Sequence, residues 1–518
     1  MLFNSPQFIY LYLPIVLVGF FWLAATSQRL AAAWLAAASC FFYAWWNPIY
    51  LGLLGASIVF NYGMGVRLAR ESARPAGQRR RALLVFAVGA NLLLLGYFKY
   101  FNFFADSARV VFDGHWHFDA IVLPLGISFF TFTQIAFLVD AWRGEAREFN
   151  FVHYTLFVTY FPHLIAGPVL HHREMMPQFA HASTYRLDWE NIAVGLAIFG
   201  LGIFKKVVLA DGIAPHANAV FQAAEAGQAL SLLDAWGGAL AYTFQLYFDF
   251  SGYSDMAIGL SRMFGVKLPL NFDSPYKAGS ISEFWRRWHM TLSRFLRDYL
   301  YIALGGNRKG PLRRHANLFV TMVLGGLWHG AGWTFVVWGA LHGFYLMVNH
   351  AWRWLVGRLG LRGGRAWRVL GWALTFVAVV VAWVFFRANS FDAALAMLGA
   401  MTGANGVAVP PDWLNALHWR LNRLAGEMGV GAGLLAGQFA DAWVWRDLAI
   451  LAAIAFFAPN TQQIMSRYRP ALDFRGGVDE AGLLRFRIGT PWLVATVLLL
   501  ATALTRGDAI SEFLYFQF

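Results

Sequence analysis

The side chain in this sequence that is best placed to move a proton is His329. It is flanked by Trp328 and Gly330 and lies in a run, residues 315–352, that contains no Asp, Glu, Lys or Arg. Such a run is long enough for one or two membrane helices, and a rise of about 1.5 Å per residue puts His329 roughly 22 Å from Arg314. An ionisable group at that depth is costly to keep, so it is a candidate functional residue, either a general base or part of a proton path. The alternative is a structural histidine that hydrogen-bonds neighbouring helices.

A second group of polar side chains interrupts the apolar run 235–259. The group consists of an amide, two acids and four hydroxyls: Gln245, Tyr247, Asp249, Ser251, Tyr253, Ser254 and Asp255. Acids inside an apolar run need a polar cavity or partners, so Asp249, Tyr253 and Asp255 are predicted to line a substrate path. The alternative is a short interfacial loop that joins two helices.

The run 151–169 is predicted to be a broken helix because it contains two prolines, Pro162 and Pro168. A broken backbone at membrane depth is tolerated only inside the protein or beside a cavity. This segment is therefore a candidate cavity wall, and His163, Pro168 and Arg173 are weaker candidates for the site.

Composition defines the class of protein to which these runs belong. The chain has 518 residues, of which 58% are hydrophobic and 13% charged, whereas a soluble domain carries about 25% charged residues. We therefore predict an all-α, polytopic integral membrane protein of roughly a dozen helices. The net charge of +13 could suggest nucleic acid, but the basic residues form short clusters between apolar runs, which is typical of membrane topology. The single cysteine, Cys40, excludes an internal disulfide and a cysteine metal cluster, and no metal site is predicted.

The expected helices are the apolar runs 8–26, 30–46, 51–66, 82–97, 121–139, 151–169, 192–209, 235–259, 316–352, 369–386, 448–458 and 492–504. No basic side chain precedes the first run, so we expect a retained helix with its N-terminus outside. Six arginines within residues 67–81 place that loop in the cytoplasm. Residues 400–440 are rich in glycine and are expected to form a long loop with short helices.

Residues 280–304 differ in kind from these runs. Aromatic residues recur at spacings of three and four, with arginines between them, which predicts an amphipathic helix in the membrane interface. His289 lies beside the aromatic stripe. The following loop, residues 305–310, contains Arg308 and Lys309 and could cradle a phosphate, but a simple cytoplasmic turn has the same composition.

Four motifs in this order resemble the membrane-bound O-acyltransferase family, and within it the alginate O-acetylation branch. They are Ser282-Glu-Phe-Trp-Arg-Arg-Trp-His289, Leu296-Arg-Asp-Tyr-Leu-Tyr-Ile302, Gly305-Gly-Asn-Arg308 and Gly325-Gly-Leu-Trp-His-Gly330. The likeness extends over nearly the whole chain up to about residue 390. We accordingly expect a single domain over residues 1–518, with a core of about 1–390 and C-terminal helices in 445–518.

The resemblance implies a helical membrane fold around a central tunnel or funnel. It matches the family's catalytic histidine to His329 and its second motif residue to His289. It also implies a cytosolic thioester donor, acetyl-CoA or a similar molecule, and no permanently bound cofactor. The implied partners are membrane lipid, periplasmic polysaccharide acetylation proteins and an exported polysaccharide as the eventual acceptor, and the implied location is a bacterial inner membrane.

On this basis His329 is expected to act as the general base that takes the proton of an acceptor hydroxyl. His289 is expected to position the substrate or to donate a hydrogen bond to the thioester oxygen, and His342 either supports His329 or packs. Four basic residues could attract the phosphates of coenzyme A, although ordinary membrane topology also explains them: Arg286, Arg287, Arg308 and Lys309. No Ser-His-Asp or Cys-His set is evident, which favours direct transfer over an acyl-enzyme.

Two other hypotheses stay open at this point. The same chemistry could act on another acceptor, such as cellulose, peptidoglycan or a teichoic acid. A membrane transporter could instead use His329 and the aspartates as a proton path, but transporters often show two similar halves and this sequence shows no such repeat. Nucleic acid is not an expected partner.

Overall fold

The computed structural model describes the chain except residues 73–76, 117, 147, 166, 361–363, 410–434, 437–438, 440–441, 475, 477–481, 507–512 and 515–518. The described part is helical apart from one parallel pair of two-residue strands, β1 (Ala408–Val409) and β2 (Leu435–Ala436). Five of its helical segments are long and apolar enough to cross a membrane: Gln7–Ala24, Ile49–Glu71, Gln78–Phe112, Trp189–Glu225 and Arg365–Arg387. The predictions of an all-α fold and of a multi-pass membrane protein are confirmed.

The N-terminal third forms a group of helices held together by polar side chains. Its elements are η1 (Gln7–Tyr12), α1 (Leu13–Ala24), α2 (Gln28–Ala44), α3 (Ile49–Ser72), α4 (Gln78–Leu95), η2 (Gly96–Tyr100), α5 (Phe101–Phe112), α6 (Ile127–Arg143) and α7 (Phe151–Thr159). Asn61 on α3 and Asn91 on α4 exchange two amide hydrogen bonds of 3.1 and 2.7 Å. Gln134 on α6 donates to Ser57 on α3 at 2.9 Å. Such interhelical bonds hold membrane helices together where lipid gives no hydrophobic drive.

The middle of the chain is built on two long neighbouring helices. Its elements are α8 (His172–Ala180), η3 (Ala182–Tyr185), α9 (Trp189–Phe204), η4 (Lys205–Ala210), α10 (Asp211–Glu225) and α11 (Leu232–Met263). A Cβ added to Gly195 of α9 would lie 2.6 Å from the carbonyl oxygen of Gly259 on α11, and one added to Gly202 would lie 2.7 Å from that of Gly252. These glycines let the two backbones approach closely, as small residues do in membrane bundles.

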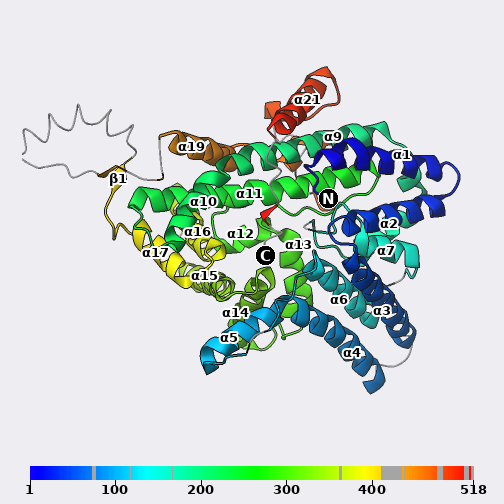
Figure 1. Cartoon of the computed structure of the whole chain (residues 1–518), viewed down its shortest axis with the longest axis horizontal. Coiled ribbons are helices and arrows are strands. Elements are labelled where there is room, and N and C mark those ends of the chain that lie inside the picture. Colours follow the sequence, from blue (N-terminus) through cyan, green and yellow to red (C-terminus); the bar gives the residue numbers. More distant parts are fainter. Residues whose placement is uncertain are drawn as a thin grey trace, which may run out of the picture.

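The remaining elements include two short helices, α12 and α13, that carry His289 between them. They are η5 (Pro275–Lys277), α12 (Ile281–Arg287), α13 (Met290–Phe295), η6 (Leu296–Tyr301), α14 (Gly310–His329), α15 (Trp333–Arg358), α16 (Arg365–Arg387), α17 (Phe391–Met401), α19 (Ala442–Phe457), α20 (Thr461–Ile464), η7 (Ser466–Tyr468), η8 (Gly482–Leu484) and α21 (Thr490–Thr505). Figure 1 shows α9 and α11 running side by side across the molecule, with α12 and α13 near its middle and the other helices fanned around them.

One alternative and one expectation about these elements were wrong. The alternative of a short loop within the run 235–259 fails, because α11 continues without a break from Leu232 to Met263. The single amphipathic helix expected over residues 280–304 is interrupted between α12 and α13 and continues beyond Phe295 as the π-helix η6. The break occurs at Trp288 and His289, where the backbone leaves the helical region.

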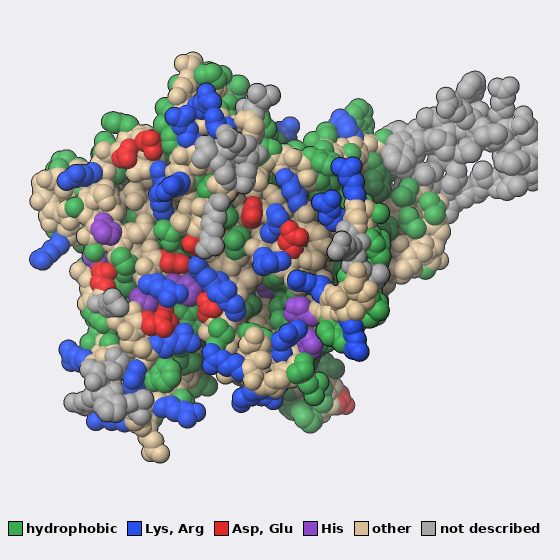
Figure 2. Space-filling model, turned by 180° about the vertical axis from the view of Figure 1, so that it is seen from behind, with side chains coloured by type: hydrophobic (Ala, Val, Ile, Leu, Met, Phe, Trp, Pro, Cys, Tyr) green, Lys and Arg blue, Asp and Glu red, His purple; other side chains and the backbone are tan. Residues whose placement is uncertain are grey.

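Two other expectations can be compared in part. The helix that begins at Phe151 ends at Thr159, before Pro162, so the prediction of a broken helix in 151–169 is confirmed. Most of the loop expected over residues 400–440 lies outside the described residues. Figure 2 shows one face of the molecule, on which many Lys and Arg side chains are spread among fewer acidic ones.

Candidate active site

His329 is the last residue of α14, where the chain turns back into α15. The turn consists of Gly330, Ala331 and Gly332, and α15 returns against α14. The two helices approach so closely that a Cβ on Gly326 would lie 2.3 Å from the carbonyl oxygen of Phe335. This packing fixes the end of α14 and therefore the place from which the His329 ring projects.

The His329 imidazole lies in an aromatic wall with a second histidine beside it. Its ring centroid is 5.1 Å from that of Trp338, 5.4 Å from that of Phe386 and 6.2 Å from that of His289. The residue is 5% exposed, and it lines a cavity of about 480 Å³. A buried imidazole that still reaches a cavity can exchange a proton with a bound molecule while bulk water is largely kept away.

His289 occupies the break between α12 and α13. Its φ of 43° is left-handed, a conformation that is uncommon for a residue other than glycine and that persists only where the surroundings hold it. The side chain is fully buried, and its Nδ1 lies 3.0 Å from Oδ1 of Asn271. Because an amide oxygen can only accept, Nδ1 of His289 carries the proton in this arrangement.

Asn271 is the residue that orients His289. Its Oδ1 also accepts a hydrogen bond from the Thr291 hydroxyl at 2.9 Å, and its Nδ2 donates to Ser254 at 3.2 Å. Its backbone oxygen accepts from the N–H of Met290 at 3.0 Å. The segment before α12 thus ties His289 to α11 and α13, and the tie fixes the imidazole tautomer.

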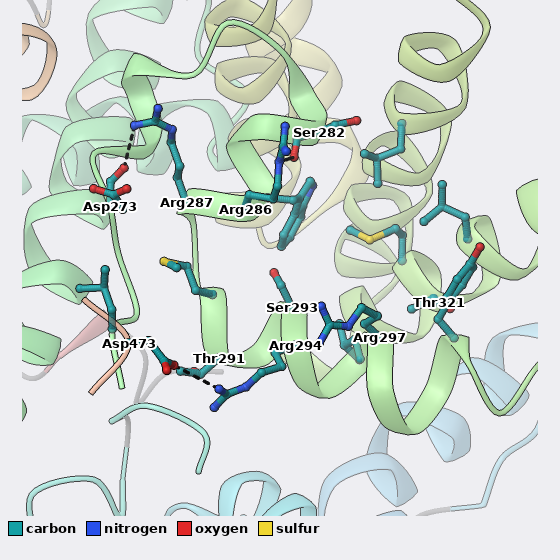
Figure 3. Close-up of a pocket in the computed structure, with 18 of the residues that line it drawn as sticks. Asp273, Ser282, Arg286, Arg287, Thr291, Ser293, Arg294, Arg297, Thr321 and Asp473 are labelled. Atoms are coloured by element: carbon teal, nitrogen blue, oxygen red, sulfur yellow. Dashed lines mark hydrogen bonds and ion pairs between the residues drawn. The ribbon is translucent and has the colours of Figure 1, made fainter. Parts of the chain in front are cut away.

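A large cavity beside α12, α13 and η6 is lined by positive charge. It measures about 1360 Å³, and its basic lining residues are Arg286, Arg287, Arg294, Arg297, Arg314 and His350. Figure 3 shows Arg286 and Arg287 on one side of this arginine cavity and Arg294 and Arg297 on the other. Two acids, Asp273 and Asp473, also line it, so an excess of positive charge faces the open space.

The arginines of this cavity differ in how they are held. Arg294 makes ion pairs with Glu174 at 2.6 Å and with Asp473 at 3.2 Å. Burial raises the pKa of the Glu174 carboxyl, and the charge of Arg294 opposes that shift. Arg287 is paired with Glu283 at 2.7 Å, whereas the Nε of Arg286 donates only to the Ser282 carbonyl at 3.2 Å.

Arg308 and Lys309, predicted for the same role, lie in the exposed turn before α14 and are not among the residues that line the arginine cavity. The structure therefore brings Arg286 and Arg287 together at the cavity and leaves the other pair outside it. Arg314, on the first turns of α14, lines it instead.

The cavity beside His329 is lined by a different set of side chains. They come from the N-terminus, the ends of α2 and η2 and the start of α6, and include Met1, Gln7, Trp45, Trp46, Lys99 and Ser128. Lys99 also lines a neighbouring cavity of about 710 Å³ together with Asn102, Asp106 and Trp333. We call the cavity of 480 Å³ the acceptor cavity; His329 and Lys99 both line it, and Lys99 also borders the neighbouring cavity.

The arginine cavity and the acceptor cavity lie toward opposite ends of α4. Arg80, at the start of α4, lies over the Trp142 ring at 5.5 Å, and the neighbouring Arg143 donates to the Asp298 carbonyl at 3.5 Å. The end of α6, which carries Trp142 and Arg143, thus contacts both the start of α4 and η6, and η6 borders the arginine cavity through Arg297. Lys99 follows the other end of α4, about 30 Å away at 1.5 Å per residue.

The predicted substrate residues of α11 have partners within the protein core. Asp249 pairs with Lys206 at 2.8 Å and accepts from the backbone of Leu514 at 3.2 Å. Asp255 pairs with Lys205 at 2.8 Å and accepts from Thr461 and Gln462. These contacts satisfy the buried carboxylates without a substrate.

Tyr253, the third of these predicted residues, stacks on Phe3 at 4.9 Å and meets Phe513 edge to face at 4.2 Å. None of Asp249, Tyr253 and Asp255 is among the residues that line the three cavities described above. The α11 residues therefore hold the fold, including both chain ends, rather than face the histidine pair.

The weaker candidates are distributed around the site. His342 is fully buried on α15, meets the Trp338 ring edge to face at a centroid distance of 4.8 Å and accepts a hydrogen bond from Trp285 at 3.3 Å, so it supports the wall behind His329. His163 is buried in the turn after α7, and Arg173 pairs loosely with Glu145 at 3.8 Å. Over the described residues, no group of three or more metal-ligating side chains is found.

Sequence reasoning missed three residues of this site. Asn271 lies in a segment between helices without a distinct pattern, and Trp338 is one aromatic residue among many. Lys99 directly follows the apolar run 82–97, a position that is also ordinary for a lysine at the membrane interface, so its type and place gave no separate signal.

These observations define an integral membrane enzyme in which one member of a buried histidine pair, His329, lines a cavity, while residues next to the other, His289, line a second cavity. The chain belongs to the membrane-bound O-acyltransferase family, whose sequence model matches residues 127–392 and so includes both His289 and His329. It is 40% identical, over the full length of both proteins, to the probable alginate O-acetylase AlgI of Azotobacter vinelandii.

Two further relatives have other names. The chain is 45% identical to the peptidoglycan O-acetyltransferase of Helicobacter pylori over 436 residues, which cover 79% of this chain and 81% of the relative. It is 28% identical to the teichoic acid D-alanyltransferase of Streptococcus thermophilus over 280 residues, which cover 51% of this chain and 68% of the relative. The protein is therefore an O-acyltransferase, and the transporter hypothesis is set aside.

Proposed function

We propose that this protein transfers an acetyl group from acetyl-CoA, or a similar cytosolic thioester, to a hydroxyl group of an exported polysaccharide or of a partner protein that passes it on. The observation that carries the proposal is that His329 lines the acceptor cavity and lies 6.2 Å from His289, whose chain neighbours Met290 and Thr291 line the arginine cavity. Two substrates that arrive from opposite sides of a membrane would meet at this pair.

The donor is assigned to the arginine cavity on grounds of charge and topology. Coenzyme A carries phosphates, for which arginine is well suited because its planar guanidinium can make two parallel hydrogen bonds. The arginine cavity lies toward the end of α4 that follows the arginine-rich stretch 67–81. Arginine excess in a short loop favours the cytoplasmic side, so a cytosolic thioester would enter here.

The acceptor is assigned to the cavity beside His329. Trp45 and Trp46 offer flat apolar faces there, and Gln7 offers a polar amide, a combination suited to a sugar. The relative named for alginate matches this chain over its full length, which supports an alginate-like polysaccharide. Peptidoglycan is the second candidate, because the relative named for it has the higher identity, 45%.

The proposed reaction is a direct transfer. His329 takes the proton from the acceptor hydroxyl while the hydroxyl oxygen attacks the thioester carbonyl carbon. The tetrahedral intermediate then collapses, the carbon–sulfur bond breaks, and the proton passes from His329 to the departing thiolate. With Nδ1 of His289 donating to Asn271, positioning of the acceptor is a better role for neutral His289 than donation to the thioester oxygen. Periplasmic acetylation proteins would receive the acetyl group or present the polymer.

The proposal is tested in cells whose polymer acetylation depends on this protein. Ester-linked acetate is measured separately in the exported polysaccharide and in the peptidoglycan. His329→Ala should lower acetate in one polymer by a factor of about 10² or more, with the protein still present in the membrane. His181→Ala, which removes an exposed histidine, should leave acetate unchanged. Loss from peptidoglycan alone would select the second acceptor, and full acetylation with His329→Ala would disprove the general-base role.

A further inference from the structure

The C-terminal end of α14, from which His329 projects, is capped by side chains from a distant part of the chain. An α-helix leaves its last four carbonyl groups without partners in the helix. In α14 the carbonyl of Gly326 accepts the N–H of Gly330 at 3.4 Å. The Leu327 carbonyl accepts the hydroxyl of Tyr100 at 3.0 Å. Lys99 supplies the remaining two bonds.

The Lys99 ammonium donates to the carbonyls of Trp328 at 2.5 Å and His329 at 3.4 Å. Its third donor reaches the hydroxyl of Ser128 on α6 at 3.2 Å. An ammonium has three N–H groups, and Lys99 has three acceptors within reach. Two of these acceptors belong to the helix end that carries His329. A positive charge also interacts favourably with the negative end of a helix dipole.

Lys99 makes these hydrogen bonds at a buried position that has no acidic partner in the described part of the chain. Lys99 is 7% exposed, and no described carboxylate lies within ion-pair distance of its ammonium. Burial of a charge without an opposite charge is costly, and here two carbonyl oxygens, the Ser128 hydroxyl and the face of the Trp328 ring compensate it. The residue lies in the π-helix η2, a conformation frequently found at functional sites, and η2 brings Lys99 and Tyr100 to consecutive carbonyls of α14.

We propose that Lys99 is a positioning residue for acyl transfer, which holds the end of α14 so that the His329 imidazole faces the acceptor cavity. The proposal rests on the proposed role of His329 as general base. Tyr100 contributes one carbonyl contact to the same cap, and Ser128 fixes the lysine against α6. Without Lys99, the carbonyls of Trp328 and His329 lose their hydrogen-bond donor. The turn 330–332 is then held less firmly.

The experiment uses the full-length protein in lipid nanodiscs, with two measurements on each variant. The first is amide hydrogen exchange of the segment 326–332, which reports the helix end and needs no activity. The second is the release of thiol from acetyl-CoA in the presence of exported polysaccharide, which gives kcat and KM. The variants are Lys99→Met, Lys99→Arg and Lys277→Met.

Lys277→Met is the matched control because Lys277 also donates to a carbonyl beyond a helix end, that of Ala458 at 2.6 Å. Lys99→Met should speed exchange of 326–332 and lower kcat roughly 10- to 100-fold, the scale of a misplaced catalytic group, with little change in KM for acetyl-CoA. Lys99→Arg should recover much of kcat, and Lys277→Met should change neither measurement.

Unchanged exchange in Lys99→Met would overturn the proposal whatever happens to activity. Faster exchange with an unchanged kcat would overturn it as well, and so would a rise of KM for the polysaccharide alone, which would make Lys99 a binding group. Absence of any thiol release that depends on His329 in the wild-type protein would contradict the proposed function instead, while the exchange measurement would still decide whether Lys99 caps α14.

Discussion

Replacement of Arg286 or Arg314 by methionine is expected to weaken acetyl-CoA binding without slowing the chemical step. Both side chains line the arginine cavity. Arg286 makes one hydrogen bond, to the Ser282 carbonyl, and Arg314 lies within hydrogen-bond distance of His315, at 3.4 Å. Neither has an ion-pair partner among the described residues, so their charges are available to the phosphates of a ligand. Methionine keeps much of the side-chain volume and removes the charge.

The size of the effect follows from the exposure of these groups. A hydrogen bond to a charged group contributes about 1.5–3 kcal/mol where it is shielded, but Arg286 is exposed and water screens its charge. A loss of about 1 kcal/mol per arginine is therefore reasonable, and it corresponds to roughly a fivefold rise in KM. Arg287, held by Glu283 at 2.7 Å, should give a smaller rise.

The assay is thiol release from acetyl-CoA by nanodisc protein at low and at high salt. In the wild type KM should rise with salt because ions screen the cavity, and both single variants should weaken this dependence while kcat stays near the wild-type value. An unchanged KM in Arg286→Met, Arg314→Met and the double variant would refute the assignment of coenzyme A to this cavity. If KM rises more in Arg287→Met than in Arg286→Met and Arg314→Met, the idea that an arginine without an acidic partner binds coenzyme A more strongly is refuted.

Two further predictions concern the scaffold of the histidine pair. Gly326→Ala should lower the melting temperature of the protein, since its Cβ would lie 2.3 Å from the Phe335 carbonyl oxygen. Gly357→Ala is the control and should be neutral or slightly stabilising, because a Cβ there meets nothing within 4 Å. Equal melting temperatures of the two variants would show that α14 and α15 can move apart without cost. Asn271→Ala should lower kcat by roughly tenfold with little change in KM, because His289 loses the acceptor that fixes its tautomer; unchanged kcat would mean that the orientation of His289 does not matter.

The sequence alone predicted the membrane class and the principal histidine. The uncharged run 315–352 indicated membrane-embedded helices, and His329 was an ionisable side chain well inside it. Both signals are local, since they depend only on the residue types within one run. The structure adds that His329 is the last residue of α14 and lines a cavity.

The acids of α11 could not be interpreted from the sequence because their partners are remote. Asp249 and Asp255 suggested either a substrate path or a loop, yet α11 is one helix in which each acid meets a lysine of η4. Those lysines are about 50 residues away along the chain, and no periodicity connects the two segments. The break at His289 was hidden for a similar reason, since Asn271 holds it from another segment.

The partners of the buried charges distinguish structural residues from residues that act on a substrate in this fold. Where a buried charge has an opposite charge within 3 Å, as Lys206 has in Asp249, its electrostatic demand is met inside the protein, and loss of one partner should cost stability. Arg286 faces a cavity and has no acidic partner of its own among the described residues, so its charge is available to a ligand. Lys99 donates to the carbonyls of a helix end, so its charge is compensated by the backbone that it positions. Loss of the charge should then affect binding or turnover. The position in the sequence does not distinguish these cases, since Arg286 and Arg287 are adjacent and only one of them is paired.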